Sequence, residues 1–195
     1  NDKYLDILTK ETLYCLYTDA MDCICKMQNQ VDTSGLDKFD KSEQMNEMSL
    51  FDEWYIGKHL EVNLSKKQSE ELHQCYEHIY TIISKIPKSF MHRDFHSRNL
   101  MVTSEKNPGV LDYQDAVIGP ITYDIASLLK DCYVAWDDET VYSMTSSFFS
   151  KIEKRHDIVY EEFEYWFDIT GLQRHLKAIG IFSRLNYRDN KSNYL

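Results

Sequence analysis

The fold is decided by residues 90–112, which read FMHRDFHSRNLMVTSEKNPGVLD. Two short apolar runs, Leu-Met-Val and Val-Leu, are separated by a polar segment that ends in Asn107-Pro108-Gly109. Turn-forming residues between two apolar runs are typical of a β-hairpin. If the runs pair antiparallel with residue 100 near residue 112, Asn99 and Asp112 are expected to lie side by side at the open end of the hairpin.

The segment before the hairpin contains the pattern H-R-D-x-x-x-x-N, from His92 to Asn99, which is the catalytic-loop pattern of protein kinases. In phosphoryl transfer the Asp accepts the proton of the attacking hydroxyl and the Asn binds magnesium. We therefore expect Asp94 to be the catalytic base, and Asn99 and Asp112 to bind Mg²⁺ with the nucleotide, since oxygen ligands suit this hard cation. A lone H-x-D is usually structural, but the loop, the hairpin and the second Asp together favour the catalytic interpretation.

Two further polar residues are interpreted as supports for this loop. A His at the start of such a loop more often braces the backbone than titrates, so His92 is expected to hold the loop in place. Asp124 follows the Gly119-Pro120 turn at the predicted start of a helix. A buried carboxylate there can accept backbone N–H bonds from the loop. Asp115 is less easily explained as a helix cap.

Composition limits the class of protein. The 195 residues carry 22 basic and 32 acidic side chains and a net charge of −10, which argues against nucleic acid or an anionic membrane as the main partner. The five Cys contain no C-x-x-C pair, which argues against a zinc ribbon or a disulfide framework and favours a reducing cytoplasm. No apolar run approaches the roughly 18 residues that span a bilayer, and no signal peptide is visible.

The chain is predicted to be mostly helical, because it contains only six Gly and three Pro. Residues 29–49 show little periodicity and are expected to form a polar connection. Helical spacing of apolar residues, with Ser65 as one N-cap, predicts helices over 4–28, 50–60, 65–86, 122–136, 138–154 and 160–187.

Four segments resemble the aminoglycoside phosphotransferase and choline kinase branch of the protein-kinase-like superfamily. They are HRDFHSRNLMV (92–102), DYQDA (112–116), GPITYD (119–124) and GLQRHLK (171–177). Within that branch the chain is similar to the bacterial anomeric sugar kinases of cell-wall recycling, which phosphorylate N-acetylmuramate and N-acetylglucosamine at the C1 hydroxyl. The loop is specific to the superfamily, whereas the QDA and GLQRHLK segments point to the subgroup.

The resemblance implies a predominantly helical α+β fold, with residues 1–195 as the C-terminal lobe of a protein-kinase-like enzyme. It implies that Asp94 is the base, that Asn99 and Asp112 bind Mg²⁺ and the ATP phosphates, and that Asp124 braces the loop. Carboxylates and Arg can bind sugar hydroxyls or an acid group, and an aromatic face can cover a pyranose ring. The candidate sugar ligands are Asp115, Arg98, Glu53 and Trp54, each of which also has a packing or ion-pair interpretation.

In this superfamily the glycine-rich nucleotide loop and the phosphate-binding Lys belong to an N-terminal β-lobe. Neither is found in residues 1–195, and the chain begins without Met near the expected interlobe hinge. The chain is therefore expected to be a fragment whose partner is its missing N-terminal lobe. Alone, it should bind ATP weakly and show little or no kinase activity.

Two alternatives stay open. The first is an aminoglycoside or other small-alcohol kinase, such as a choline-like kinase, which the net charge of −10 does not exclude. The second is a non-catalytic pseudokinase or a sugar-binding module. The set of Asp94, Asn99 and Asp112 argues against the second, because a binding scaffold needs no base and two metal ligands at this spacing.

Overall fold

The computed structural model describes residues 2–192, which divide into two compact units. The hairpin unit comprises the residues up to Lys38 together with Ile86–Asp168. The helical unit comprises Phe39–Lys85 and the residues from Ile169 onward. The fold is predominantly helical with small antiparallel sheets, as the sequence predicted.

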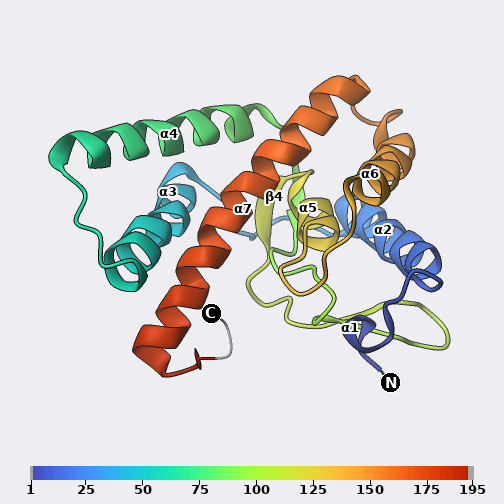
Figure 1. Ribbon diagram of the computed structural model, residues 1–195. Helices are drawn as coiled ribbons and strands as arrows, with labels where there is room; N and C mark the ends of the chain where they lie inside the picture. The colour runs from blue at the N-terminus through green and yellow to red at the C-terminus, as the bar shows by residue number, and fades with distance from the viewer. Residues whose placement is uncertain (1, 193–195) are drawn as a thin grey trace. The chain divides into compact units, whose positions relative to one another are not determined.

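The hairpin unit surrounds two short sheets with helices (Figure 1). Its long helix α2 contacts β1, α5 and α6, and its buried side chains include Tyr17, Ala20 and Ile24. The elements of this unit are α1 (Tyr4–Ile7), α2 (Leu13–Gln30), β1 (Lys88–Met91), β2 (Leu100–Met101), β3 (Gly109–Val110), β4 (Val117–Pro120), α5 (Tyr123–Leu129), α6 (Asp138–Ile152) and the start of α7 (Tyr160–Asp189).

Both sheets of the hairpin unit are antiparallel pairs of strands. In the first, Ser89 of β1 lies opposite Gly119 of β4, and a Cβ at Gly119 would collide with the Met91 side chain. Glycine therefore lets β4 approach β1 closely just before the chain enters the catalytic loop. In the second sheet β2 pairs with β3, and the Val102 N–H donates to the Asp2 carbonyl at 2.8 Å.

The loop between β2 and β3 is fixed to the N-terminal helices by Asn107. Its Nδ2 donates to the Tyr4 hydroxyl at 2.8 Å and to Asp19 Oδ2 at 2.7 Å. Its Oδ1 accepts the Thr103 N–H at 3.2 Å. Burial raises the pKa of Tyr4, so this phenol stays neutral. One amide side chain thus ties the hairpin loop to α1 and α2.

The helical unit consists of α3 (Lys41–Leu50), the π-helical segment η1 (Phe51–His59), α4 (Lys66–Lys85) and the larger part of α7. Helix α3 contacts both η1 and α4 (Figure 1). Asp40 caps α3 by accepting the Glu43 N–H at 2.9 Å. Ser65 precedes α4 in a reciprocal cap, in which Ser65 N–H donates to Gln68 Oε1 at 2.9 Å and Ser65 Oγ accepts the Gln68 N–H at 3.3 Å.

A buried carboxylate joins α3 to α7 within the helical unit. Glu47 is 7% exposed and accepts hydrogen bonds from Gln173 Nε2 at 2.9 Å and from Lys177 Nζ at 2.8 Å. Both donors belong to the GLQRHLK segment that the sequence analysis associated with the subgroup. A buried carboxylate is stabilised only if it is paired, so these contacts fix α3 against α7.

Several predicted helix boundaries are wrong. Residues 8–12 interrupt the helix predicted over 4–28, and a chain of Thr9 and Thr12 hydrogen bonds forms a turn there. Residues 41–49, predicted to be a polar connection, lie in α3. The helix predicted over 122–136 ends at Leu129. The helices predicted over 138–154 and 160–187 and the Ser65 cap are confirmed.

None of the helices in the described residues is both long and apolar enough to cross a membrane. This agrees with the absence of a long apolar run in the sequence.

Gly180 provides a test of the helix contact at the end of α3. A Cβ at this position of α7 would lie 2.6 Å from Leu50 Cβ and would also collide with the Leu50 backbone. Replacing Gly by Ala inside a helix normally stabilises the helix. Here the collision with Leu50 should make the substitution destabilising. We expect Gly180→Ala to lower the free energy of unfolding by about 1–3 kcal/mol in urea titrations followed by circular dichroism.

The matched control is Leu172→Ala, at a position of the same helix that is 45% exposed. Leu172→Ala should lower the free energy of unfolding clearly less than Gly180→Ala does. A Gly180→Ala chain as stable as the wild type would show that α7 and Leu50 are not in this close contact.

Candidate active site

The catalytic loop begins where β1 ends, and its first residue is buried. His92 has no exposed surface, and its ring lies edge-on to Phe95 with 5.8 Å between the ring centroids. Neither ring nitrogen has a hydrogen-bond partner among the described residues. His92 therefore contributes packing and a backbone N–H to the loop, and its role as a structural support stays a prediction.

The carboxylate of Asp124 holds the start of the loop. It is 1% exposed, in the first turn of α5. Its Oδ2 accepts the His92 N–H at 2.8 Å and its Oδ1 accepts the Arg93 N–H at 3.1 Å. These are the backbone contacts that the sequence predicted for Asp124. Arg93 has a φ of 78°, a conformation that residues with a side chain rarely adopt, so the two hydrogen bonds hold a strained backbone in place.

Asn99 closes the loop from its other end. Its Nδ2 donates to the Asp94 carbonyl at 3.0 Å, and its backbone N–H donates to the His96 carbonyl at 2.9 Å. The His96 N–H in turn donates to the Asp94 carbonyl at 3.1 Å. Because the amide nitrogen of Asn99 is bound to the loop, its side-chain oxygen is the atom that remains for a cation.

A second buried carboxylate, Asp131, supports the middle of the loop and was missed in the sequence. Its Oδ2 accepts the N–H of Ser97 at 2.9 Å and the Ser97 hydroxyl at 2.5 Å, and its Oδ1 accepts the Tyr133 N–H at 3.0 Å. The sequence carried no signal for this contact, because residues 130–136 were predicted to continue a helix. In the structure they form the loop after α5 that brings Asp131 to Ser97.

Arg98, a predicted sugar ligand, lies against an aromatic ring. Its guanidinium carbon is 4.5 Å from the centroid of Tyr133, and the His96 ring meets the same Tyr133 edge-on at 5.4 Å. This packing is the alternative that the sequence analysis left open for Arg98. A stacked guanidinium still presents its N–H edge to a ligand.

The hairpin forms as predicted, but its register is shifted by two residues. Leu100 pairs with Val110 rather than lying near Asp112, and the Leu111 N–H donates to the Asn99 carbonyl at 2.9 Å. Asn99 therefore lies opposite Leu111, and Asp112 follows directly after that partner. The predicted side-by-side register of Asn99 and Asp112 is wrong by this offset, because β3 begins at Gly109, which was assigned to the turn, and Val102 bonds to Asp2 instead of pairing across the hairpin.

Gln114 links the two acidic residues that follow the hairpin. Its Nε2 donates to Asp112 Oδ1 at 2.7 Å and lies 3.5 Å from Asp115 Oδ2. Asp112 has a φ of 66°, and all three side chains are exposed. Gln114 thus contacts the carboxylates of both Asp112 and Asp115. It also fixes one oxygen of the Asp112 carboxylate and leaves the other for a ligand.

The remaining two sugar candidates, Glu53 and Trp54, belong to η1 in the helical unit. Glu53 is exposed and Trp54 is partly buried.

The donor atoms next to the loop fit a magnesium ion. The described residues contain no group of three or more His, Cys, Asp or Glu that could hold a metal alone. Mg²⁺ commonly takes only one or two protein ligands and completes its shell with substrate phosphates and water. The Asn99 side-chain oxygen and one Asp112 carboxylate oxygen are hard ligands of the right kind.

Comparisons with known proteins identify the family of this chain. A family model described as the phosphotransferase enzyme family matches residues 4–155. N-acetylmuramate/N-acetylglucosamine kinase from Pseudomonas putida is 38% identical over 195 residues, covering 98% of this chain and 57% of its own length. The kinase of the same name from Neisseria meningitidis serogroup B is 38% identical over 182 residues, covering 92% of this chain and 54% of its own length. The chain spans about half the length of the curated relatives it matches.

Solved structures of aminoglycoside phosphotransferases share the fold. APH(3'')-Id from Streptomyces rimosus, solved with ADP and streptomycin, aligns with a TM-score of 0.59 at 12% identity, covering 89% of this chain and 67% of its own. ADP-bound APH(2'')-Ib aligns with a TM-score of 0.57 at 17% identity, covering 98% of this chain and 62% of its own. With the family model covering most of its length, the chain belongs to the phosphotransferase enzyme family.

Proposed function

We propose that the chain is the C-terminal lobe of a kinase that transfers the γ-phosphate of ATP to the C1 hydroxyl of N-acetylmuramate or N-acetylglucosamine. The observation that carries this proposal is the loop from His92 to Asn99, held at both ends by Asp124 and by the Asn99 amide. The names of the relatives, which are 37–38% identical over nearly the whole chain, support the sugar as acceptor. A cytoplasmic location stays a prediction.

In the proposed reaction Asp94 orients the C1 hydroxyl and accepts its proton as the oxygen attacks the γ-phosphorus of the ATP substrate in line. No phosphoenzyme forms, since a positioned acceptor and a neutralised phosphate are sufficient for phosphoryl transfer. Asn99 and Asp112 hold Mg²⁺, which when bound neutralises charge on the phosphates. Asp124 keeps the backbone of the loop fixed. Little free energy is therefore needed to reorganise Asp94 in the transition state.

Sugar recognition is assigned to Asp115 and Arg98 in the hairpin unit and to Glu53 and Trp54 in the helical unit. The Gln114 contact supports Asp115, because it draws this carboxylate toward Asp112. Arg98 is assigned for its positive charge, which suits an acid group of the sugar, and its face rests on Tyr133. The assignments of Glu53 and Trp54 rest on the family resemblance and on their side-chain chemistry.

The length of the relatives supports the proposal that an N-terminal lobe is missing from this chain. The relatives are nearly twice as long as the part that this chain covers, and residues 1–195 contain no glycine-rich nucleotide loop. We expect the 195-residue chain alone to have little or no activity. Measurable turnover by this chain would contradict that part of the proposal.

The acceptor and the base are tested together in a phosphate-transfer assay on the longer parent protein with ATP and Mg²⁺. N-acetylmuramate and N-acetylglucosamine should be phosphorylated, whereas methyl glycosides of the same sugars should not, since their C1 oxygen is blocked. Asp94→Asn should lower kcat by about 10²- to 10⁴-fold, because the general base is removed while its size is kept.

Transfer to an aminocyclitol instead of the sugars would favour the aminoglycoside-kinase alternative. Binding of sugar with no transfer to any acceptor would favour a pseudokinase or sugar-binding module. An Asp94→Asn parent as active as the wild type would contradict the assignment of the base.

Gln114 provides a test of the metal site. Gln114→Ala removes the hydrogen bond that orients Asp112, and a single such bond is worth about 0.5–1.5 kcal/mol. In the parent enzyme at saturating ATP, the Mg²⁺ concentration for half-maximal rate should rise by roughly three- to tenfold, with kcat at saturating Mg²⁺ little changed. The neighbouring exposed Tyr113→Phe is the control. Equal Mg²⁺ dependence in all three proteins would contradict the role of Gln114.

A further inference from the structure

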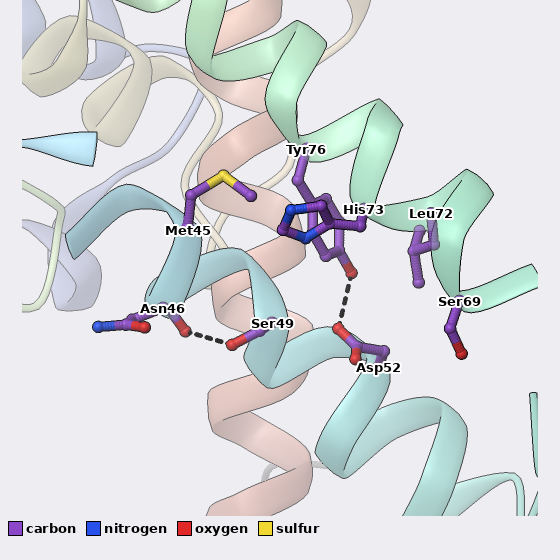
Figure 2. A pocket seen from close by; sticks show the side chains of 8 residues that line it. All are labelled: Met45, Asn46, Ser49, Asp52, Ser69, Leu72, His73 and Tyr76. Carbon is purple, nitrogen blue, oxygen red and sulfur yellow. Dashed lines mark hydrogen bonds between the residues drawn. The ribbon is translucent and has the colours of Figure 1, made fainter. Parts of the chain in front are cut away.

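The helical unit contains a pocket that the catalytic loop does not use. It has a volume of about 350 Å³ and lies between α3, η1 and α4 (Figure 2). This volume is within the range of pockets that hold small molecules. Every residue that lines it belongs to the helical unit, so its properties follow from that unit alone.

The most buried polar group in the pocket is the phenol of Tyr76. This residue is 3% exposed, and its hydroxyl donates to Asp52 Oδ1 at 3.0 Å, as Figure 2 shows. Burial, together with the charge of Asp52, raises the pKa of Tyr76, so the phenol keeps its proton and is the donor. The bond fixes the Asp52 carboxylate from one side and leaves Oδ2 as an oriented acceptor in the pocket.

Neutral polar groups surround this carboxylate on two helices. Ser49 on α3 donates its hydroxyl to the Asn46 carbonyl at 3.0 Å, so the lone pairs of its oxygen remain available to a donor on a ligand (Figure 2). Ser69 on α4 supplies a second hydroxyl from the opposite wall. The pocket can therefore form several hydrogen bonds with one small molecule.

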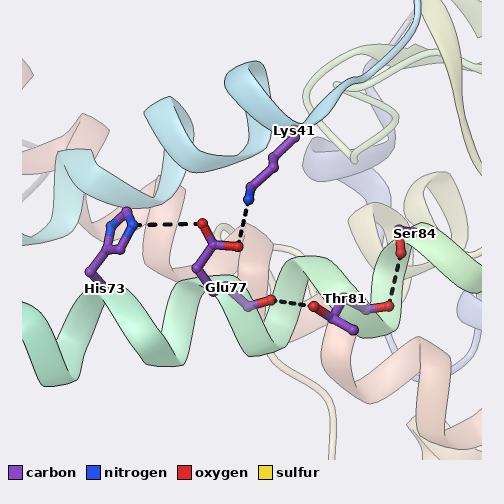
Figure 3. Close-up of polar contacts among 5 residues, drawn as sticks. All are labelled: Lys41, His73, Glu77, Thr81 and Ser84. Atoms are coloured by element: carbon purple, nitrogen blue, oxygen red, sulfur yellow. Dashed lines mark hydrogen bonds and ion pairs between the residues drawn. The ribbon is translucent and has the colours of Figure 1, made fainter.

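His73, one of the residues that line the pocket, lies next to an ion pair between Glu77 and Lys41. Its Nε2 lies 3.6 Å from Glu77 Oε1, and Lys41 Nζ binds the other oxygen of that carboxylate at 2.7 Å (Figure 3). Lys41 also lies over the Tyr80 ring, with its Nζ 5.5 Å from the ring centroid. Lys41 is thus paired with Glu77.

The lining disfavours an anionic ligand and offers both polar and apolar contacts. It includes no Lys or Arg among the described residues, so a phosphate or carboxylate would meet the Asp52 charge without a counterion. Met45 and Leu72 add apolar surface next to the hydroxyls (Figure 2). A pyranose matches this combination, because it presents hydroxyls along its edge and C–H groups on its face.

We propose that this pocket binds a neutral polyhydroxylated molecule of monosaccharide size, with its hydroxyls on Asp52 and Ser69 and its C–H face on Leu72 and Met45. None of the residues that line this pocket is assigned a role in the proposed transfer to C1. The proposal is therefore tested by binding alone, with a probe that cannot be phosphorylated at C1.

The test uses the 195-residue chain labelled with ¹³C at the methionine methyl groups and titrated with methyl β-D-glucopyranoside. This probe has a blocked C1 oxygen, so it cannot serve as the acceptor in the proposed reaction. The Met45 methyl signal should shift and saturate. In Asp52→Asn, which keeps the side-chain size and one oxygen for Tyr76, the dissociation constant should rise about tenfold, since hydrogen bonds to a charged group are the stronger kind.

Leu72→Ser should also weaken binding, because it removes the apolar surface under the sugar. Gln74→Ala, on the same helix but outside the lining, should bind like the wild type. The proposal is overturned if the Met45 signal does not saturate, or if Asp52→Asn binds the sugar as tightly as the wild type. Tighter binding of inorganic phosphate or of glucosamine than of the neutral glycoside would also overturn it.

Discussion

The active-site loop depends on one buried carboxylate, that of Asp124. It accepts the backbone N–H groups of His92 and Arg93, and thereby fixes two consecutive peptide units immediately before Asp94. Arg93 has a positive φ, so without these bonds the backbone would relax to a more favourable conformation. Charge-assisted hydrogen bonds are the stronger kind, which makes Asp124 a suitable brace for Asp94, the base in the proposed reaction.

Three further polar contacts extend this constraint from the loop to its surroundings. Asn99 binds the Asp94 carbonyl, Asp131 binds Ser97, and Gln114 binds Asp112. Asn99 and Asp112 each use one polar atom for support, which in the proposed reaction leaves the other for Mg²⁺, whereas both oxygens of Asp131 serve as support. In Asn99 and Asp112, the hydrogen bond made to the protein orients the side-chain oxygen that would bind the ligand.

The loop could be predicted from the sequence because its residue types are set by chemistry at fixed spacing. Asp94 and Asn99 were singled out by the H-R-D-x-x-x-x-N spacing, and Asp124 by its place at a predicted helix start, where it makes the backbone contacts that were expected of it. The hairpin register could not be predicted, since turn residues mark a loop but not the residues at which the two strands end and begin. Helix α3 was missed because its buried residues are mainly polar, Gln44 and Glu47 among them, although the Asp40 cap with Glu43 was a usable signal. Asp131 was missed because its partner, Ser97, is distant in sequence.

The central claim is tested most directly by amide hydrogen exchange of the loop in the wild-type chain and in Asp124→Asn. The substitution keeps the size of the side chain but leaves one acceptor oxygen for two N–H donors. We predict much faster exchange at His92 and Arg93, with exchange in α4 and α6 unchanged. Ser127→Ala, which removes only a 3.5 Å contact with the Arg93 carbonyl, should behave like the wild type. Unchanged exchange at His92 and Arg93 in Asp124→Asn would contradict the claim that this carboxylate holds the loop.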